Sequence, residues 1–197
     1  MNLESLKPFI QPPNKILDIG ANIGNFAELC KKTWDINPYV FSIEPNKMCE
    51  SYLRSRCDAY KITLLGKNNS PIEYYTDNRN LTGEGNSVYK EIHYTDYTPN
   101  VIIPETLDCM FGLEDRFDLI KIDTQGSEID IMMGGIELIK RANCVILEVS
   151  IIPYNTGAPS YMDVISFMNE LRYYPLLQIG RHYLNNQLIQ LDLAFSK

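Results

Sequence analysis

Short apolar segments alternate with amphipathic segments along most of the chain, and this alternation constrains the fold more than any other feature. The apolar segments are rich in β-branched and aromatic residues, which is typical of buried strands. They lie at residues 15–20, 39–44, 60–65, 117–123 and 144–150. The amphipathic segments have the apolar spacing of helices. We predict helices at residues 23–34, 46–57, 106–113, 128–142 and 161–171.

Two further strands are predicted at residues 175–180 and 188–195, with a turn at 182–187 and no helix between them. Strands separated by helices form parallel sheets, whereas two consecutive strands without a helix pair antiparallel. The sequence therefore predicts an α/β fold, in which a mostly parallel sheet has helices on both faces and an antiparallel strand at one edge. Ligands of such sheets bind outside the carboxyl ends of the strands.

Residues 66–105 interrupt the alternation. The segments IEYYT and VYKEI lie there between clusters of Asn, Gly and Ser. Short β-type segments between such clusters indicate a strand, a flexible loop and a hairpin arm. We expect this part of the chain to form a lid over the ligand site.

Length and composition bound the class of protein. The 197 residues fit a single domain spanning residues 1–197. With 18 basic and 25 acidic residues the net charge is -7, which repels phosphate backbones and predicts no nucleic-acid partner. No apolar segment reaches the roughly 18 residues of a membrane span, and the first residues lack the apolar core of a signal peptide.

The cysteines point to a cytoplasmic protein, and the histidines argue against a multi-histidine metal centre. The five cysteines form no C-x-x-C pair, so we interpret them as reduced thiols of a cytoplasmic protein. The two histidines lie far apart in the sequence. Two or three carboxylates near the pocket could bind magnesium, but no spacing of ligands demands a metal. No pattern predicts an oligomeric state.

The first predicted strand ends in a glycine-rich turn, DIGANIG. Gly20 allows a tight turn close to a ligand, and Gly24 is expected to let the following helix pack close to the strand. The pattern differs from the G-x-G-x-x-G of dinucleotide enzymes, because Asp18 takes the place of the first glycine. A carboxylate there would repel a pyrophosphate and attract an ammonium group. An ordinary strand-to-helix turn is the alternative interpretation.

Glu44 ends the second predicted strand, 24 positions after Gly20. An acidic residue at about this distance holds the ribose hydroxyls in dinucleotide-binding sheets, because a carboxylate can accept hydrogen bonds from both hydroxyls. Taken alone, Glu44 could equally be a solvated residue at a strand end.

Several charged residues in or beside the predicted strands at 117–123 and 144–150 are candidates for chemistry. Lys121 and Asp123 share a strand face, since side chains alternate with period two. Glu148 lies within the apolar segment CVILEVS. If the two strands are neighbours, one interpretation is an ion pair between Lys121 and Glu148 across them, and the other is a direct catalytic role. Asp123 and Glu128 are expected to face the ligand pocket as a pair of carboxylates. The alternative for Glu128 is an acidic residue that stabilises the first turn of a helix.

Four segments together resemble the FkbM family of class I S-adenosylmethionine-dependent methyltransferases. These segments are DIGANIGNF, SIEP, LIKIDTQGSEIDIMMGG and VILEV, and the resemblance extends from about residue 16 to residue 174. It implies a Rossmann-like, seven-stranded sheet and S-adenosyl-L-methionine as the cofactor. One departure is Gln125, where the family usually has Glu.

The resemblance also implies roles for individual residues. The residues expected to hold the methionine part of the cofactor are Asp18, Gly20, Ala21, Asn22, Gly24 and Asn25. Those expected around its ribose and adenine are Glu44, Pro45, Leu65 and Gly66. Asp123 would lie close to the sulfonium, and Asn86 and Ser87 resemble a family loop near the cofactor.

Methyl transfer to a hydroxyl needs a group that accepts the hydroxyl proton. We expect Asp123 or Glu128 to do this, with His93 in the irregular segment as the alternative. Members of the family generally methylate hydroxyls of sugars, glycolipids or related natural products. The resemblance therefore implies O-methylation of a small-molecule or glycan acceptor, selected by residues 66–105.

Two other functions remain open from the sequence. A nicotinamide-dependent oxidoreductase on a similar sheet would be expected to carry G-x-G-x-x-G, which Asp18 interrupts. A protein that binds S-adenosylmethionine without catalysis is the other alternative, suggested by Gln125 and by the absence of an added acceptor domain.

Overall fold

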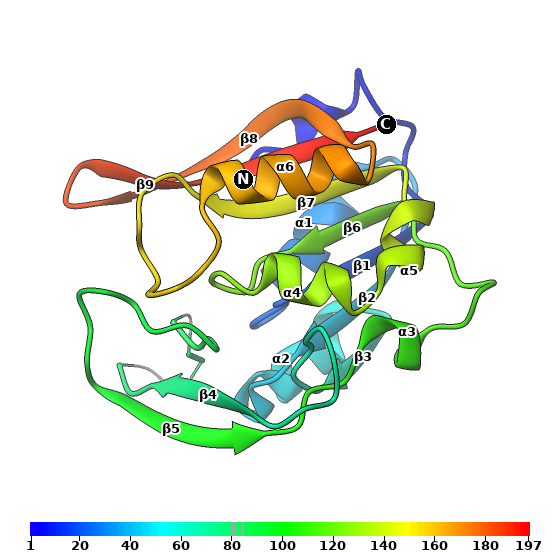
Figure 1. Cartoon of the computed structure of the whole chain (residues 1–197). Coiled ribbons are helices and arrows are strands. Elements are labelled where there is room, and N and C mark those ends of the chain that lie inside the picture. Colours follow the sequence, from blue (N-terminus) through cyan, green and yellow to red (C-terminus); the bar gives the residue numbers. More distant parts are fainter. Residues whose placement is uncertain (80–81, 84) are drawn as a thin grey trace.

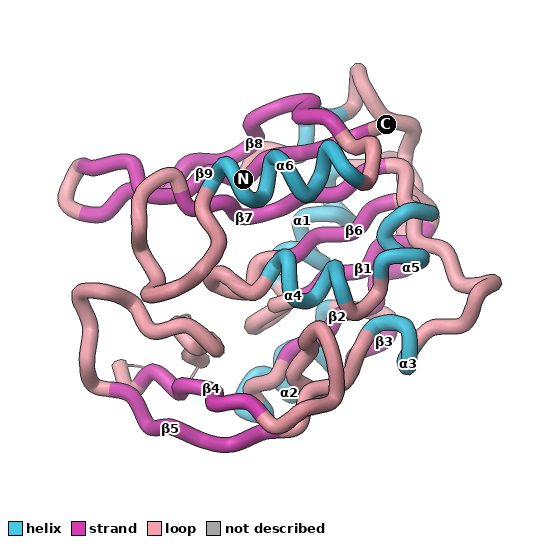
Figure 2. The backbone as a smooth tube through the Cα atoms, in the orientation of Figure 1, coloured by secondary structure: helices cyan, strands magenta, loops and turns pink. Residues whose placement is uncertain are grey.

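A seven-stranded sheet forms the centre of the molecule, as Figures 1 and 2 show. The computed structural model describes residues 1–79, 82–83 and 85–197. In sheet order the strands are β3 (Ala59–Ile62), β2 (Tyr39–Glu44), β1 (Lys15–Ile19), β6 (Leu119–Ile122), β7 (Cys144–Ser150), β9 (Gln187–Ser196) and β8 (Tyr174–Leu184). The first five are parallel, and β9 runs antiparallel to both of its neighbours. The predicted fold class is confirmed.

The antiparallel strand was predicted at the edge of the sheet, but β9 lies one strand in from the edge, between β7 and β8. The edge strand β8 therefore runs parallel to β7. Strands β8 and β9 are longer than predicted and form a hairpin that extends beyond β7 in Figure 1. The predicted turn at 182–187 shrinks to Asn185 and Asn186, whose φ angles are 49° and 65°. Asn tolerates this left-handed backbone, and two such residues make the tight turn that matches the twist of a hairpin.

Helices cover both faces of the sheet, as predicted. They are η1 (Leu3–Leu6), α1 (Asn25–Thr33), η2 (Lys47–Cys49), α2 (Glu50–Arg56), α3 (Leu107–Met110), α4 (Glu128–Met133), α5 (Ile136–Arg141) and α6 (Tyr161–Glu170). Leu3 and Phe26 pack from η1 and α1 on one face. Ile131, Leu138 and Val164 pack from α4, α5 and α6 on the other, seen in front of the sheet in Figure 1. Among the described residues, no helix is long and apolar enough to cross a membrane.

The single helix predicted at 128–142 is wrong, because the chain breaks at Gly134 and Gly135 into α4 and α5. A Cβ on Gly134 would overlap the carbonyl oxygen of Gly66, and one on Gly135 would overlap Leu107. The Gly134 carbonyl also accepts a hydrogen bond of 2.9 Å from the N–H of Asp108. The close approach of the loop at Gly66 and of α3 therefore requires the glycines that interrupt the helix.

Residues 66–105 contain a separate two-stranded antiparallel ribbon of β4 (Ile72–Asp77) and β5 (Tyr97–Ile102). The ribbon faces the carboxyl ends of the parallel strands across the lower part of Figure 1. The prediction that VYKEI forms a hairpin arm is wrong, since the ribbon pairs Tyr75 with Pro99. Pro99 has no N–H to donate, which suits an outer strand. In the segment of chain that links β4 to β5, isolated β-bridges pair Ser87 with Tyr75 and Glu91 with Asn155.

Three charged side chains meet at the centre of the sheet. Asp18 and Lys121 are directly opposite one another on the neighbouring strands β1 and β6. The Nζ atom of Lys121 lies 3.7 Å from Oδ1 of Asp18 and 3.0 Å from Oδ2 of Asp123. The predicted Lys121–Glu148 pair is therefore wrong. Strands β6 and β7 are neighbours, but their register places Lys121 opposite Ile146, and the ammonium group turns the other way.

Burial and charge act against each other in this cluster. Burial raises the pKa of Asp18 to about 6, and Lys121 opposes the rise. Burial disfavours the charge of Lys121, but the carboxylates of Asp123 and Asp18 overcome this effect and raise its pKa. Lys121 is thus a single cation shared by two carboxylates, those of Asp18 and Asp123.

We expect Lys121→Met to lower the free energy of unfolding by about 3–5 kcal/mol, because it leaves a buried carboxylate without its partner. Urea denaturation measures the change. The control is Lys61→Met in the half-exposed Lys61–Glu105 pair, which should cost about 1 kcal/mol or less. Combining Lys121→Met with Asp18→Asn should recover part of the loss, because the buried position then carries no charge. Equal losses in the Lys61 and Lys121 variants would contradict this account.

Candidate functional site

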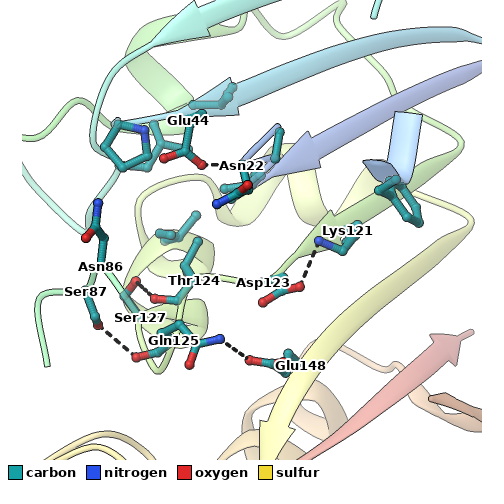
Figure 3. A pocket seen from close by; sticks show the side chains of 18 of the residues that line it. Asn22, Glu44, Asn86, Ser87, Lys121, Asp123, Thr124, Gln125, Ser127 and Glu148 are labelled. Atoms are coloured by element: carbon teal, nitrogen blue, oxygen red, sulfur yellow. Dashed lines mark hydrogen bonds and ion pairs between the residues drawn. The ribbon is translucent and has the colours of Figure 1, made fainter. Parts of the chain in front are cut away.

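A cavity of about 530 Å³ opens at the carboxyl ends of the parallel strands, and Figure 3 shows its polar lining. Its size is within the range of small-molecule and cofactor sites. The predicted site residues that line it are Gly20, Ala21, Asn22, Asn25, Glu44, Pro45, Leu65, Asn86, Ser87 and Asp123. The predicted residues outside its lining are Asp18, Gly24, Gly66, His93 and Glu128. Most of the predicted cofactor-binding residues are therefore brought together in one place.

The turn after β1 forms one wall of the cavity. Gly20 has a φ of 73°, and a Cβ there would overlap the carbonyl oxygen of Asp123. The N–H groups of Gly20 and Ala21 both donate to the carbonyl of Ile43, at 3.0 and 3.1 Å. The turn is thereby fixed to strands β6 and β2 on either side. Only glycine allows this close packing.

Gly24 has a different role from the predicted one. It precedes α1 with a φ of 81°, and a Cβ there would press against Arg56 and Leu53 of α2. The expectation that Gly24 lets the helix approach the strand is therefore wrong, because the close neighbour is another helix. Gly24 contributes to the cavity by the position it gives to α1.

Glu44 is held rigidly at the end of β2. Its Oε2 accepts a hydrogen bond of 2.8 Å from the N–H of Asn22 (Figure 3). Its Oε1 accepts one of 2.9 Å from the N–H of Asn46. Burial raises the pKa of Glu44 to about 7, although the two backbone donors oppose the rise. Each carboxylate oxygen keeps a further lone pair, so Glu44 can accept from two neighbouring hydroxyls.

Asp123 lies at the end of β6 and lines the cavity beside Lys121, as Figure 3 shows. Its side chain is 27% exposed, whereas that of Asp18 is completely buried behind Lys121. Asp123 is therefore the acid of this cluster that a ligand can reach. Asp18 acts on the cavity through Lys121.

The structure does not pair Glu128 with Asp123 at the cavity. Oε1 of Glu128 accepts hydrogen bonds from the N–H groups of Thr124 (2.9 Å) and Gly126 (3.1 Å). Burial raises its pKa, and the backbone donors oppose the rise. The predicted pair of pocket carboxylates is therefore wrong, because the N–H groups of the preceding turn hold the side chain of Glu128 outside the cavity lining.

Gln125 connects both sides of the cavity. Its φ of 56° is uncommon for a residue with a side chain. Its Nε2 donates a hydrogen bond of 2.8 Å to Oε2 of Glu148, and its carbonyl accepts one of 2.8 Å from Oγ of Ser87 (Figure 3). The turn after β6 is thus tied to β7 and to the segment that covers the cavity.

The segment 66–105 contributes unequally to the site. Asn86 and Ser87 line the main cavity, and Asn86 Oδ1 accepts a hydrogen bond of 2.7 Å from the N–H of Asp77. Gly66 lines a separate cavity of about 280 Å³. His93 is exposed in a turn and lines neither cavity.

Glu148, His182 and Asp192 also line the cavity, from three adjacent strands. The sequence alone predicts no ligand role for His182 or Asp192. A signal was present, since Asp192 is an acid within the apolar segment LIQLDLAF, just as Glu148 is within CVILEVS. Burial and the nearby carboxylates of Asp123, Glu128 and Asp192 raise the pKa of Glu148.

Solved structures share this fold. An FkbM methyltransferase from Methylobacillus flagellatus matches with a TM-score of 0.54 and 16% identity, over 98% of this chain and 48% of that one. An uncharacterised protein from Listeria monocytogenes matches with 0.55 and 13%, over 98% and 66%. A precorrin-6y C5,15-methyltransferase from Geobacter metallireducens matches with 0.52 and 11%, over 99% and 87%. The chain thus spans about half of the FkbM protein and about two thirds of the Listeria protein.

Two comparisons of the sequence give different results. No curated protein matches the chain in sequence. A family model of the methyltransferase FkbM domain matches residues 18–175, which include the glycine turn, Glu44, Asp123 and Glu148. Because this match covers most of its residues, the chain belongs to the FkbM methyltransferase family.

Proposed function

We propose that this methyltransferase transfers the methyl group of S-adenosylmethionine to a hydroxyl oxygen of a small-molecule or glycan acceptor. The observation that carries the proposal is the convergence of Gly20, Glu44 and Asp123 on one cavity, at the ends of three adjacent strands. Gly20 and Glu44 suit a ligand made of an adenosine and an amino-acid tail. Asp123 would lie close to the sulfur of this ligand, where the acceptor would react. That the methylated atom is a hydroxyl oxygen, and that the acceptor is a small molecule or glycan, is inferred from the resemblance of the sequence motifs to the family.

The lining of the cavity fits the parts of the cofactor. Glu44 offers free lone pairs to the two ribose hydroxyls. Leu64, Leu65 and Pro45 supply an apolar surface for the adenine. Asp123 supplies negative charge for a cationic ligand.

S-Adenosylmethionine supplies an electrophilic methyl group on a positively charged sulfur, and the protein aligns it with the acceptor. Of the three predicted proton acceptors, only Asp123 lies in the cavity lining. Lys121 holds its Oδ2 at 3.0 Å and so fixes the direction of the carboxylate. Asp123 would accept the proton of the acceptor hydroxyl, and the oxygen would then be free to bond to the methyl carbon.

Residues 66–105 are proposed to select the acceptor. The described residues Asn86, Ser87 and Val88 line the cavity opposite the ends of the strands. Oγ of Ser87 donates a hydrogen bond to the carbonyl of Gln125. The wall formed by Asn86, Ser87 and Val88 is thereby fixed to the turn that follows Asp123. An acceptor would enter between the two.

Binding of S-adenosylhomocysteine should weaken about 10- to 30-fold between pH 8 and pH 5.5, because Glu44 with a pKa of about 7 loses its charge over this range. Isothermal calorimetry measures the change. Glu44→Gln should bind weakly at both pH values and show little pH dependence. NAD serves as the matched ligand for the oxidoreductase alternative and should not bind. Tight, pH-independent binding by Glu44→Gln would contradict the role of this carboxylate.

Asp123→Asn should lower the turnover number by about 10²- to 10⁴-fold, because the amide cannot accept the hydroxyl proton. The assay follows release of S-adenosylhomocysteine with a panel of sugars and glycolipids. Asp108→Asn, on the exposed side of α3, is the control and should retain full activity. Full turnover by Asp123→Asn would exclude Asp123 as the base. Cofactor binding without turnover of any acceptor would favour the non-catalytic alternative.

A further inference from the structure

Three potential metal ligands converge on the wall of the cavity formed by β7, β8 and β9. Glu148 and Asp192 are directly opposite one another on β7 and β9, and His182 reaches them from β8. One ligand atom from each lies within 4.8 Å of the other two. Nε2 of His182 is 3.1 Å from Oδ1 of Asp192 and 3.6 Å from Oε1 of Glu148. We propose that Glu148, His182 and Asp192 bind a divalent transition-metal ion.

The charge of the cluster supports a cation. The side chains of Glu148 and Asp192 are only 5% and 2% exposed, so two carboxylates are buried side by side. Nε2 of His182 can carry a single proton, which can serve only one of the two acids well. A divalent ion at the same place would contact both carboxylates and the imidazole nitrogen together, and would compensate the negative charge.

Asp192 gives a second, independent observation. Its Oδ2 is buried and has no hydrogen-bond partner among the residues that the structure describes. A buried carboxylate oxygen without a donor is costly unless a cation faces it. A Cβ at position 180 would overlap this carboxylate, so Gly180 on β8 provides the space in which the carboxylate lies. Binding of both Asp192 oxygens to a metal would give Oδ2 the partner that the protein does not supply.

The surrounding residues hold Glu148 in the orientation that a metal ligand needs. Its Oε2 accepts hydrogen bonds from Nε2 of Gln125 (2.8 Å) and from Nε2 of Gln190 (2.9 Å). These two donors turn Oε1 toward His182. Fixed second partners of this kind are typical of metal ligands. Gln125 is also an amide, so it adds no third carboxylate to the cluster.

The donor set indicates the class of metal. One imidazole with two carboxylates suits Mn²⁺, Fe²⁺, Co²⁺ or Zn²⁺, whereas Mg²⁺ prefers oxygen ligands alone. Three protein ligands leave coordination positions open. Because all three side chains line the cavity that Asp123 also lines, the open positions can face an acceptor.

The catalytic consequence rests on the proposed methyl transfer, whereas metal binding does not. An acceptor hydroxyl bound to the metal would have a lowered pKa and would release its proton to Asp123. Its oxygen then forms a bond to the methyl carbon while the carbon–sulfur bond breaks and leaves its electron pair on sulfur. The cation thus ionises the acceptor, and Asp123 takes up the proton.

The test uses the full chain, freed of metal with a chelator and without cofactor or acceptor. Titration with MnCl₂, followed by the EPR signal of free Mn²⁺, should show a single saturable site per chain. His182→Gln should weaken binding at least about 10-fold. The matched control is His93→Ala, the other histidine of the chain, which is exposed and should bind like the wild type. Equal affinity in the wild type and His182→Gln would overturn the proposal.

Two further measurements keep the result interpretable. Co²⁺ bound to the wild-type chain should give visible absorption bands that Mn²⁺ in excess removes, and absence of such bands would also overturn the proposal. Calorimetry with S-adenosylhomocysteine on the metal-free chain should give the same affinity for the wild type and His182→Gln. That result separates the metal site from the cofactor site, because either can fail while the other holds.

Discussion

The ammonium group of Lys121, buried between Asp18 and Asp123, is the interaction on which the site depends. It lies between two adjacent strands of the sheet, and it allows an acid to occupy the fully buried end of β1. It also fixes Asp123 at the end of β6, with one face toward the cavity. A hydrophobic residue at position 121 would preserve the sheet pairing but would leave Asp18 unpaired and Asp123 without its anchor. Stability of the sheet and orientation of the proposed base therefore rest on a single cation.

Much of the fold was predictable because burial imposes a simple pattern. The segment CVILEVS is apolar at nearly every position, as a strand covered on both faces must be, and its predicted bounds match β7. Gly20 and Glu44 were predictable because a tight turn and a strand end restrict residue type locally. The partner of Lys121 was not, since period two gives the face of a side chain but not the neighbouring strand toward which it leans. The direction of the Glu128 side chain was not predictable either. Sequence spacing brings Glu128 near Asp123, but the backbone N–H groups of Thr124 and Gly126 decide where its carboxylate points.

The wall formed by the last hairpin shows a different limit of sequence reasoning. The predicted turn at 182–187 left His182 outside any strand. The two left-handed asparagines shorten the turn, extend β8 to Leu184 and place His182 opposite Gln190, within reach of Asp192. Proximity of this kind depends on hairpin register, which a shift of one residue would reverse. The acid at position 192 was visible as an anomaly in an apolar strand, but its partners follow only from the tertiary structure.

The balance of charge around the cavity bears on how a methyltransferase of this design exchanges its ligands. Asp123 and Glu148 line the cavity with Lys121 and His182, and the buried Asp18 and Asp192 lie directly behind them. The proposed cofactor carries a positive sulfur, and its product after transfer carries a neutral one. The attraction between Asp123 and the proposed cofactor therefore falls when the methyl group leaves, because the sulfur loses its positive charge. In the proposed function, Asp123 would therefore favour the charged cofactor over its neutral product, while Glu44 would contact the ribose of both.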